Sequence, residues 1–325
     1  MRFTDLHCDT LYSLNYFKDK GTLKHNDLCI DEEKLKKGGS LLQAFACFTD
    51  LGRWSDLPIS QLEACADRSY KHVMDLMDLY ERDAKDTSFI LCKSAKDLPE
   101  KDAEGIYTIL TVEEGGIINN DMNRLEHLYE RGCRLITLTW NHDNCLASPN
   151  SKDSNLMALG LKSFGKTVVE RMNELHMVVD VSHLSDGGFW DICDLQKSAG
   201  RPFVASHSCA RAIMNHQRNM TDEMLKALGN LGGVVGLNYC GHFLQENTKS
   251  TVEAMVKHIR HMVNVAGIEA VGLGSDFDGF DEKSELADAS QMPKLFDALE
   301  AAGFKNSEIE KIAYGNTIRV LKDLL

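Results

Sequence analysis

Histidine and acidic residues follow several apolar runs of this 325-residue sequence. His7 and Asp9 end the first run, Glu113 follows IYTILTV, and His183 and His207 follow VVDVS and PFVAS. Imidazole nitrogens and carboxylate oxygens are ligands of zinc and other divalent ions in proteins. Together these residues predict a site for two metal ions, with zinc as the first choice and other divalent ions left open.

Each of these residues also has a purely structural interpretation. A histidine after a strand is often a half-buried residue with satisfied hydrogen bonds, and paired acids such as Glu113 and Glu114 suit a helix N-terminus. The spacing of His7 and Asp9 favours the metal interpretation, because residues two apart on a strand point to the same side. The other H-x-D pair, at residues 25–27, lies in a polar stretch and indicates exposed surface.

The elements that would carry these residues are short apolar runs, which alternate with longer amphipathic stretches. Continuous apolar runs are typical of strands buried on both faces of a parallel sheet. The predicted strands are Phe3–Asp9, Leu42–Phe48, Ser88–Cys92, Gly105–Glu113, Arg134–Trp140, Met177–His183, Pro202–His207, Gly233–Tyr239 and Ala270–Asp276. The predicted helices are Pro58–Tyr80, Asn123–Arg131, Ala158–Leu175, Thr221–Leu231, Thr251–Ala266, Gln291–Ala302 and Asn306–Leu325.

This strand-then-helix order predicts an α/β fold. Over about 300 residues it favours a single (β/α)8 barrel of the TIM type, residues 1–325, over two doubly wound domains. Enzymes on that barrel carry their chemistry at the carboxyl ends of the strands, which is where the candidate ligands lie.

Composition and motifs exclude several other functions. The formal net charge of −13 would repel nucleic-acid phosphates and an anionic membrane surface. No apolar run approaches a membrane span of about 18 residues, the N-terminus lacks the apolar segment of a signal peptide, and the ten cysteines form no C-x-x-C pair. We therefore expect a cytoplasmic protein with reduced cysteines. The G-x-S-x-G, P-loop and H-E-x-x-H motifs are absent from the sequence.

The motifs together resemble the membrane (renal) dipeptidase family of binuclear zinc metallopeptidases, in a soluble, bacterial-type form. The resemblance covers nearly the whole chain. It rests on D-L-H-C-D-T at 5–10, T-V-E-E-G-G at 111–116, L-Y-E-R-G-C-R-L-I-T-L-T at 128–139, V-D-V-S-H at 179–183, S-H-S at 206–208, Q-R-N-M-T-D-E-M-L at 217–225, G-S-D-F-D-G at 274–279 and G-N-T-I-R-V-L at 315–321.

The resemblance implies a (β/α)8 barrel that hydrolyses dipeptides with two Zn2+ ions per chain. His7 and Asp9 would hold one ion, His183 and His207 the other, and the carboxylate of the T-V-E motif would bridge them. The family usually has one glutamate before Gly-Gly, whereas this chain has two. We assign the bridge to Glu113, because it directly follows the strand and keeps the family spacing to L-Y-x-x-G.

Three further positions follow from the resemblance. Asp276 matches the acidic residue beside the metal-bound water, and Arg218 matches the arginine that binds the terminal carboxylate of the substrate. The family often has a histidine directly after L-T-L-T, near the scissile carbonyl, where this chain has Trp140. If the strand extended that far, His142 would point to the same side as Trp140 and could take that role. The other interpretation is a Trp140 that lines the pocket and a solvated His142.

The implied reaction is the attack of a metal-bridging hydroxide on the peptide carbonyl. Asp276 would transfer the proton to the leaving amine, His142 would stabilise the oxyanion, and Arg218 would select dipeptides over longer peptides. The expected partners are a dipeptide substrate and a second copy of the chain in a homodimer, with no nucleic acid or membrane. Two alternatives stay open: another metal-dependent amide hydrolase, although such relatives usually carry H-x-H on the first strand, and a non-catalytic metal- or peptide-binding relative.

Overall fold

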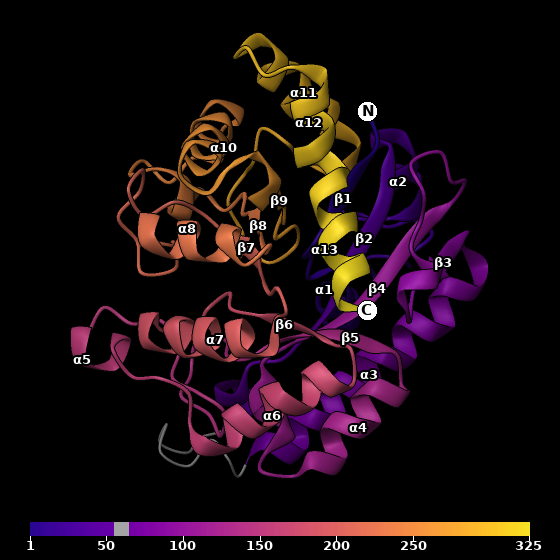
Figure 1. The fold of residues 1–325 in the computed structure, drawn as a ribbon. Coiled ribbons are helices and arrows are strands. Elements are labelled where there is room, and N and C mark those ends of the chain that lie inside the picture. The colour runs from indigo at the N-terminus through magenta and orange to yellow at the C-terminus, as the bar shows by residue number, and fades with distance from the viewer. Residues whose placement is uncertain (55–64) are drawn as a thin grey trace.

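The computed structural model describes residues 1–54 and 65–325, and its centre is a barrel of parallel strands (Figure 1). Eight strands follow one another around the ring in chain order: β1 (Phe3–Asp5), β2 (Ser40–Phe48), β4 (Ile106–Glu113), β5 (Cys133–Thr137), β6 (Val178–Asp180), β7 (Val204–Ser208), β8 (Val234–Leu237) and β9 (Val271–Leu273). Backbone hydrogen bonds bridge the last strand and the first, from Leu6 N to Leu273 O at 2.9 Å and from Asp9 N to Phe277 O at 2.8 Å.

A ninth strand, β3 (Phe89–Leu91), lies outside this ring. It pairs with the first half of β4, at Ile106–Thr108, while β5 pairs with the second half from Leu110 onward. All nine predicted strands are therefore confirmed, and the barrel prediction is confirmed with eight of them in the ring.

Helices surround the barrel (Figure 1). Their bounds are α1 Thr10–Tyr16, α2 Glu32–Gly38, α3 Ala66–Asp83, α4 Met122–Glu130, α5 Ser154–Met157, α6 Ser163–Glu174, α7 Asp186–Ala199, α8 Asp222–Asn230, α9 Gly241–Leu244, α10 Val252–Ala266, α11 Pro293–Ala301, α12 Asn306–Glu310 and α13 Asn316–Leu324. Within the described part of the chain, none of them is both long and apolar enough to cross a membrane.

The predicted helices are confirmed with shifted bounds. The predicted Pro58–Tyr80 helix is present from Ala66, and its residues 58–64 lie outside the described part of the chain. The predicted Asn306–Leu325 helix is interrupted by a π-helical turn at Lys311–Gly315.

Helices α1, α2, α5, α7 and α9 were not predicted from the sequence. For α7 the end signals are present, because Ser185 caps its first turn and Gly200 ends it at φ +63°. The glycine pair in its first turn, Gly187 and Gly188, obscures the helical pattern.

The interior of the barrel is closed at one end, and the candidate metal ligands lie at the other. Inward-facing apolar side chains of the strands pack with Ile318, Val320, Leu321 and Leu324 of α13, which covers the end at which the strands begin. The carboxyl ends of the strands point the opposite way, and these ends and the loops that leave them carry the candidate ligands. One barrel therefore supplies both a sealed core and a ring of polar positions.

Candidate metal centre

The structure brings the five predicted ligands together, all of them buried, at the carboxyl ends of the strands. Glu113, the last residue of β4, lies between the three histidines. Its Oε2 is 3.4 Å from His7 Nε2, and its Oε1 is 3.1 Å from His183 Nε2 and 3.4 Å from His207 Nε2. A carboxylate whose two oxygens face different imidazoles has the arrangement that a bridging ligand requires.

The second part of the cluster surrounds His7. Its Nε2 lies 3.3 Å from Asp9 Oδ2 and 3.9 Å from Asp276 Oδ1. Ligand atoms of His7, Asp9 and Asp276 lie within 4.8 Å of one another, and the same holds for His7, Glu113 and His207. His7 belongs to both groups, so two cations could lie side by side.

The protonation pattern on the other side of Glu113 shows that the cluster fits a cation. His183 Nδ1 donates to Asn141 Oδ1 at 3.1 Å, because an amide oxygen can only accept. Ser206 Oγ donates to a carboxylate and so accepts from His207 Nδ1 at 2.7 Å. Both Nε2 atoms are then lone-pair acceptors, although they lie only 3.1 Å apart and beside a carboxylate. A divalent cation satisfies all of these acceptors at once.

Burial and charge keep these two histidines neutral. Burial and the nearby Arg218 guanidinium lower the pKa of His183 to about 4. Burial, with the charge of His7, holds the pKa of His207 well below its usual range. Neutral imidazole is the form that binds metal. Asp9 Oδ1 and Glu113 Oε1 are buried without a hydrogen-bond donor among the described residues, as expected of atoms intended for ions.

A buried carboxylate orients the His207 ligand. Asp180 Oδ1 accepts the backbone N–H groups of Ser182 and Ser206 at 3.0 and 2.8 Å. Its Oδ2 accepts the hydroxyls of Ser206 and Thr137, each at 2.6 Å. Asp180 thereby connects three neighbouring strands, and through Ser206 it fixes the tautomer of His207.

Asp5 repeats this arrangement on the other side of the barrel. Its Oδ1 accepts the backbone N–H of His7 at 3.3 Å and of Ser275 at 2.7 Å. Its Oδ2 accepts from Ser275 Oγ at 2.7 Å and from Gln43 Nε2 at 3.0 Å. The residue after Ser275 is Asp276, just as the residue after Ser206 is His207. The sequence analysis does not predict Asp5 or Asp180, although Asp180 is an acid inside the apolar run MVVDV.

Glu114 points away from the ligands. Its backbone adopts φ +90°, which turns the side chain from the barrel axis. Its Oε1 accepts from Gly116 N at 2.7 Å and Asn144 Nδ2 at 2.6 Å, and its Oε2 accepts from Trp140 N at 3.1 Å. Burial raises the pKa of Glu114 to about 7. Glu114 therefore supports the loop after β5, and Glu113 remains the candidate for the bridging ligand.

Asp276 lies at the edge of the cluster with one oxygen free to act. Asn238 Nδ2 donates to its Oδ2 at 2.8 Å, while Oδ1 faces His7 and Asp9. The backbone of Asp276 adopts φ +62°, in the left-handed region that L-residues rarely occupy. Burial raises its pKa to about 7, which suits a group that accepts and returns a proton near neutral pH.

Arg218 lies behind the histidines as a buried cation. Its Nη2 donates to the backbone oxygen of His207 at 3.1 Å, and its guanidinium carbon lies 5.3 Å from the ring centre of Phe243. Its Nε is buried without a hydrogen-bond partner in the described part of the chain. Arg218 is not among the side chains that line the cavity over Asp9, Glu113, His183 and Asp276, whereas Phe243 beside it is.

Trp140 and His142 lie beyond the end of their strand. Because β5 ends at Thr137, strand alternation does not determine how they point. Trp140 lines the cavity, with its ring 6.2 Å from that of His183. His142 Nε2 lies 2.9 Å from Asp50 Oδ1, and this contact raises the pKa of the imidazole. In this conformation His142 is outside the set of cavity-lining residues.

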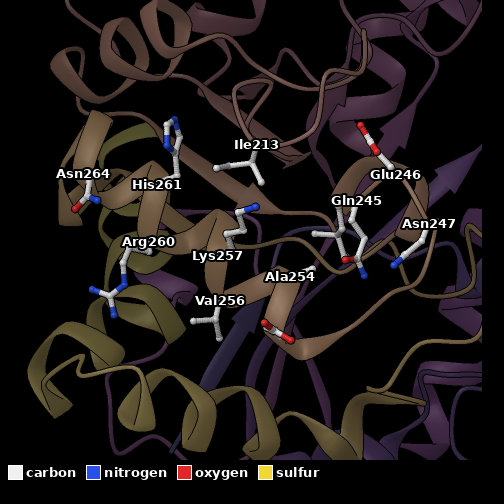
Figure 2. A pocket seen from close by; sticks show the side chains of 12 residues that line it. Ile213, Gln245, Glu246, Asn247, Ala254, Val256, Lys257, Arg260, His261 and Asn264 are labelled. Atoms are coloured by element: carbon white, nitrogen blue, oxygen red, sulfur yellow. The ribbon is translucent and has the colours of Figure 1, made fainter.

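The metal-site cavity has a volume of about 560 Å³ and contains Asp9, Glu113, His183 and Asp276 in its wall. A larger hollow of about 940 Å³ lies along α10 and is lined by Lys257, Arg260 and His261 among others (Figure 2). Among the described residues, both groups of metal-ligating side chains belong to the barrel end and neither to this hollow. The cavity over the barrel is therefore the candidate metal site.

The sequence matches a family of known proteins. The model of the family described as membrane dipeptidase (peptidase family M19) matches residues 1–324. A protein of Klebsiella pneumoniae encoded in the pqqA 5′ region is 33% identical over 72% of this chain and 88% of its own length. An uncharacterised dipeptidase of Schizosaccharomyces pombe is 31% identical over 94% of this chain and 73% of its own length.

Solved structures agree with this match. A crystal structure of dipeptidase AC, a metallopeptidase of family M19, superposes with a TM-score of 0.83 at 27% identity and covers 100% of this chain and 98% of that one. A metallopeptidase of Rhodobacter sphaeroides, crystallised with a phosphinate mimic of the dipeptide L-Ala-D-Ala, gives a TM-score of 0.84 at 25% identity, over 100% and 99% of the two chains.

Proposed function

Because the chain belongs to the membrane dipeptidase family, peptidase family M19, and is a metallo-dipeptidase, we propose that it hydrolyses dipeptides with two zinc ions bound at the barrel end. His7 and Asp9 would hold one ion, His183 and His207 the other, and Glu113 would bridge them. The observation that carries this proposal is the position of Glu113, whose two oxygens face His7 on one side and His183 with His207 on the other.

When bound, the ions would supply a water of lowered pKa and a Lewis acid for the peptide carbonyl. Asp276 would accept the proton of that water at Oδ1 and return it to the departing amine, since Asn238 already occupies its Oδ2.

Arg218 would recognise the free carboxylate of the substrate. A buried guanidinium with an unpaired Nε has donors to offer, and a charge-assisted pair in a partly desolvated site is strong. A carboxylate anchored at a fixed distance from the ligands would restrict the enzyme to dipeptides. The phosphinate dipeptide mimic bound by the Rhodobacter sphaeroides relative supports this substrate class.

His142 is proposed as the group that stabilises the developing oxyanion. An imidazole N–H can donate a hydrogen bond to a carbonyl oxygen. To reach a carbonyl oxygen the ring must rotate away from Asp50. Trp140 occupies the position nearer to His183.

The test combines metal analysis with a dipeptide panel. The purified protein should contain two divalent ions per chain, and hydrolysis of dipeptides should stop on chelation and return when zinc is added. Cyclic amides and N-acyl amino acids form the comparison arm, because a broader amide hydrolase would prefer them. Binding of metal without turnover of any substrate would favour a non-catalytic relative. A cytoplasmic location and a homodimer stay predictions, to be checked by fractionation and by light scattering.

A further inference from the structure

Aromatic side chains line one side of the metal-site cavity in unbroken contact. The ring centre of Tyr12 in α1 lies 5.0 Å from that of Phe48, the last residue of β2, and the two rings meet edge to face. Phe48 meets Trp140 in the same way at 4.9 Å. Trp140 in turn approaches the ligand His183. We call Tyr12, Phe48 and Trp140 the aromatic wall; all three line the cavity.

Phe48 of the aromatic wall and Arg218 lie on opposite sides of the ligands. Phe48 ends β2, and Arg218 is hydrogen-bonded to His207 of β7. In the eight-stranded ring β2 and β7 are four strands apart in either direction, so they are diametrically opposed. The ligand cluster around Glu113 lies between them.

We propose that the aromatic wall binds the side chain of the amino-terminal residue of the substrate and makes the enzyme selective for large apolar residues there. This inference rests on the proposed function. With the carboxylate at Arg218 and the peptide carbonyl at the ligand cluster, the first residue of a dipeptide extends toward Phe48 and Tyr12. Phe243, the aromatic residue beside Arg218, lies on the side of the second residue.

The chemistry of the aromatic wall suits an apolar guest. Edge-to-face rings present both faces and edges, and an apolar side chain placed against them leaves water without losing hydrogen bonds. Pockets of this kind discriminate between side chains that differ by one methylene by about ten- to two-hundredfold in kcat/KM. We therefore expect a difference of at least tenfold between a large apolar side chain and alanine.

Two mirrored dipeptide series test the inference on the zinc-loaded enzyme. In the first, X-Gly carries Gly, Ala, Leu or Phe as the first residue; in the second, Gly-X carries them as the second. For the wild type we expect kcat/KM to be at least tenfold higher for Phe-Gly than for Ala-Gly, with a smaller spread along Gly-X. In Phe48→Ala and Tyr12→Ala the ratio of Phe-Gly to Ala-Gly should fall toward one, whatever the absolute rates.

The control variant is Trp190→Ala, which removes an exposed aromatic residue of α7 outside the cavity and should leave the ratio unchanged. Tyr12 is only partly buried, so its variant stays informative if Phe48→Ala folds poorly. A wild-type ratio near one, a ratio that survives both substitutions, or selectivity confined to Gly-X would each overturn the inference while leaving the dipeptidase intact. Failure to cleave any of the dipeptides would instead refute the proposed function.

Discussion

His183 and His207 face each other with their Nε2 atoms 3.1 Å apart, and the hydrogen bonds at their Nδ1 atoms leave neither Nε2 with a proton. Lone pairs at this distance repel, and Glu113 adds a negative charge between them. A cation between these atoms would be coordinated by both imidazoles and by the carboxylate.

The two adjacent glutamates should differ sharply when each loses its charge. Glu113→Gln should lose both metal and activity, because an amide has one oxygen and a nitrogen that only donates. Glu114→Gln should keep its metal and most of its activity but lose about 1–3 kcal/mol of unfolding free energy, since three donors converge on Glu114. Metal content and urea unfolding of both variants provide the measurement. Metal loss in Glu114→Gln alone would move the bridge by one residue.

Ser206→Ala should weaken metal binding without removing a ligand. The hydroxyl connects Asp180 to His207 Nδ1, and loss of such an outer contact lowers metal affinity about 10- to 100-fold. Competition with a chelator of known affinity measures the change. The matched control is Ser198→Ala on the exposed part of α7, which should bind metal as the wild type does. Equal metal affinities of the two variants would show that Asp180 does not influence metal binding through Ser206.

Arg218→Ala should lose about 2–5 kcal/mol of binding to the ground state or transition state of a dipeptide, with its metal content unchanged. Arg218→Lys should recover only part of this loss, because lysine lacks the planar fork. A dipeptide and its C-terminal amide are the matched substrates. The wild type should strongly prefer the free acid, and Arg218→Ala should not. Equal cleavage of both by the wild type would contradict the carboxylate assignment and favour the broader amide hydrolase.

His142→Asn should lower kcat about 10²- to 10³-fold and change KM little, as expected when a donor to the oxyanion is lost. The exposed His25, which pairs with Glu33 at the surface, offers a matched control in His25→Asn. Both variants should contain normal metal. If His142→Asn keeps its kcat, the interaction of His142 with Asp50 is structural and the oxyanion is stabilised elsewhere.

His258 should make the fold sensitive to acid. The fully buried ring accepts the backbone N–H of Ala210 at Nδ1 and donates from Nε2 to Leu244 O, so only the neutral form fits. Burial lowers its pKa to about 4 from 6.5, so the unfolded chain binds the proton more readily. The stabilisation is complete above pH 6.5 and is lost as the pH falls toward 4, by about 3 kcal/mol in all.

Comparison with His258→Gln isolates this contribution. The variant should be less stable than the wild type at pH 7.5, and the difference in unfolding free energy should shrink between pH 6.5 and 4.5. A constant difference across that range would show that His258 does not titrate there.

Much of this architecture could be predicted because the strands are buried on both faces. A strand buried on both faces, such as GVVGLNY, is a continuous apolar run, so its position can be read from the sequence. The ligands follow directly after such runs. The strand around β5 was predicted to reach Trp140 but ends at Thr137, because Glu114 accepts the N–H of Trp140 and draws the chain out of the sheet.

Asp5 and Asp180 show what the sequence pattern could not provide. Each gains its role from donors on neighbouring strands, such as Ser275 and Thr137, and which strands are neighbours is a property of the closed ring. The same holds for the aromatic wall, whose three residues come from three separate segments.

Because the ring closes between β9 and β1, we expect the two halves of the metal centre to form at different stages of folding. The His183–His207 half joins residues 24 apart in the chain, whereas the Asp5–Ser275 contact that supports the other half spans 270 residues. Contacts of such long range are completed late, after the loop entropy of almost the whole chain has been overcome. During synthesis the second half of the site can exist only after β9 has left the ribosome. Tight binding of two ions would therefore indicate that β9 has closed the ring against β1.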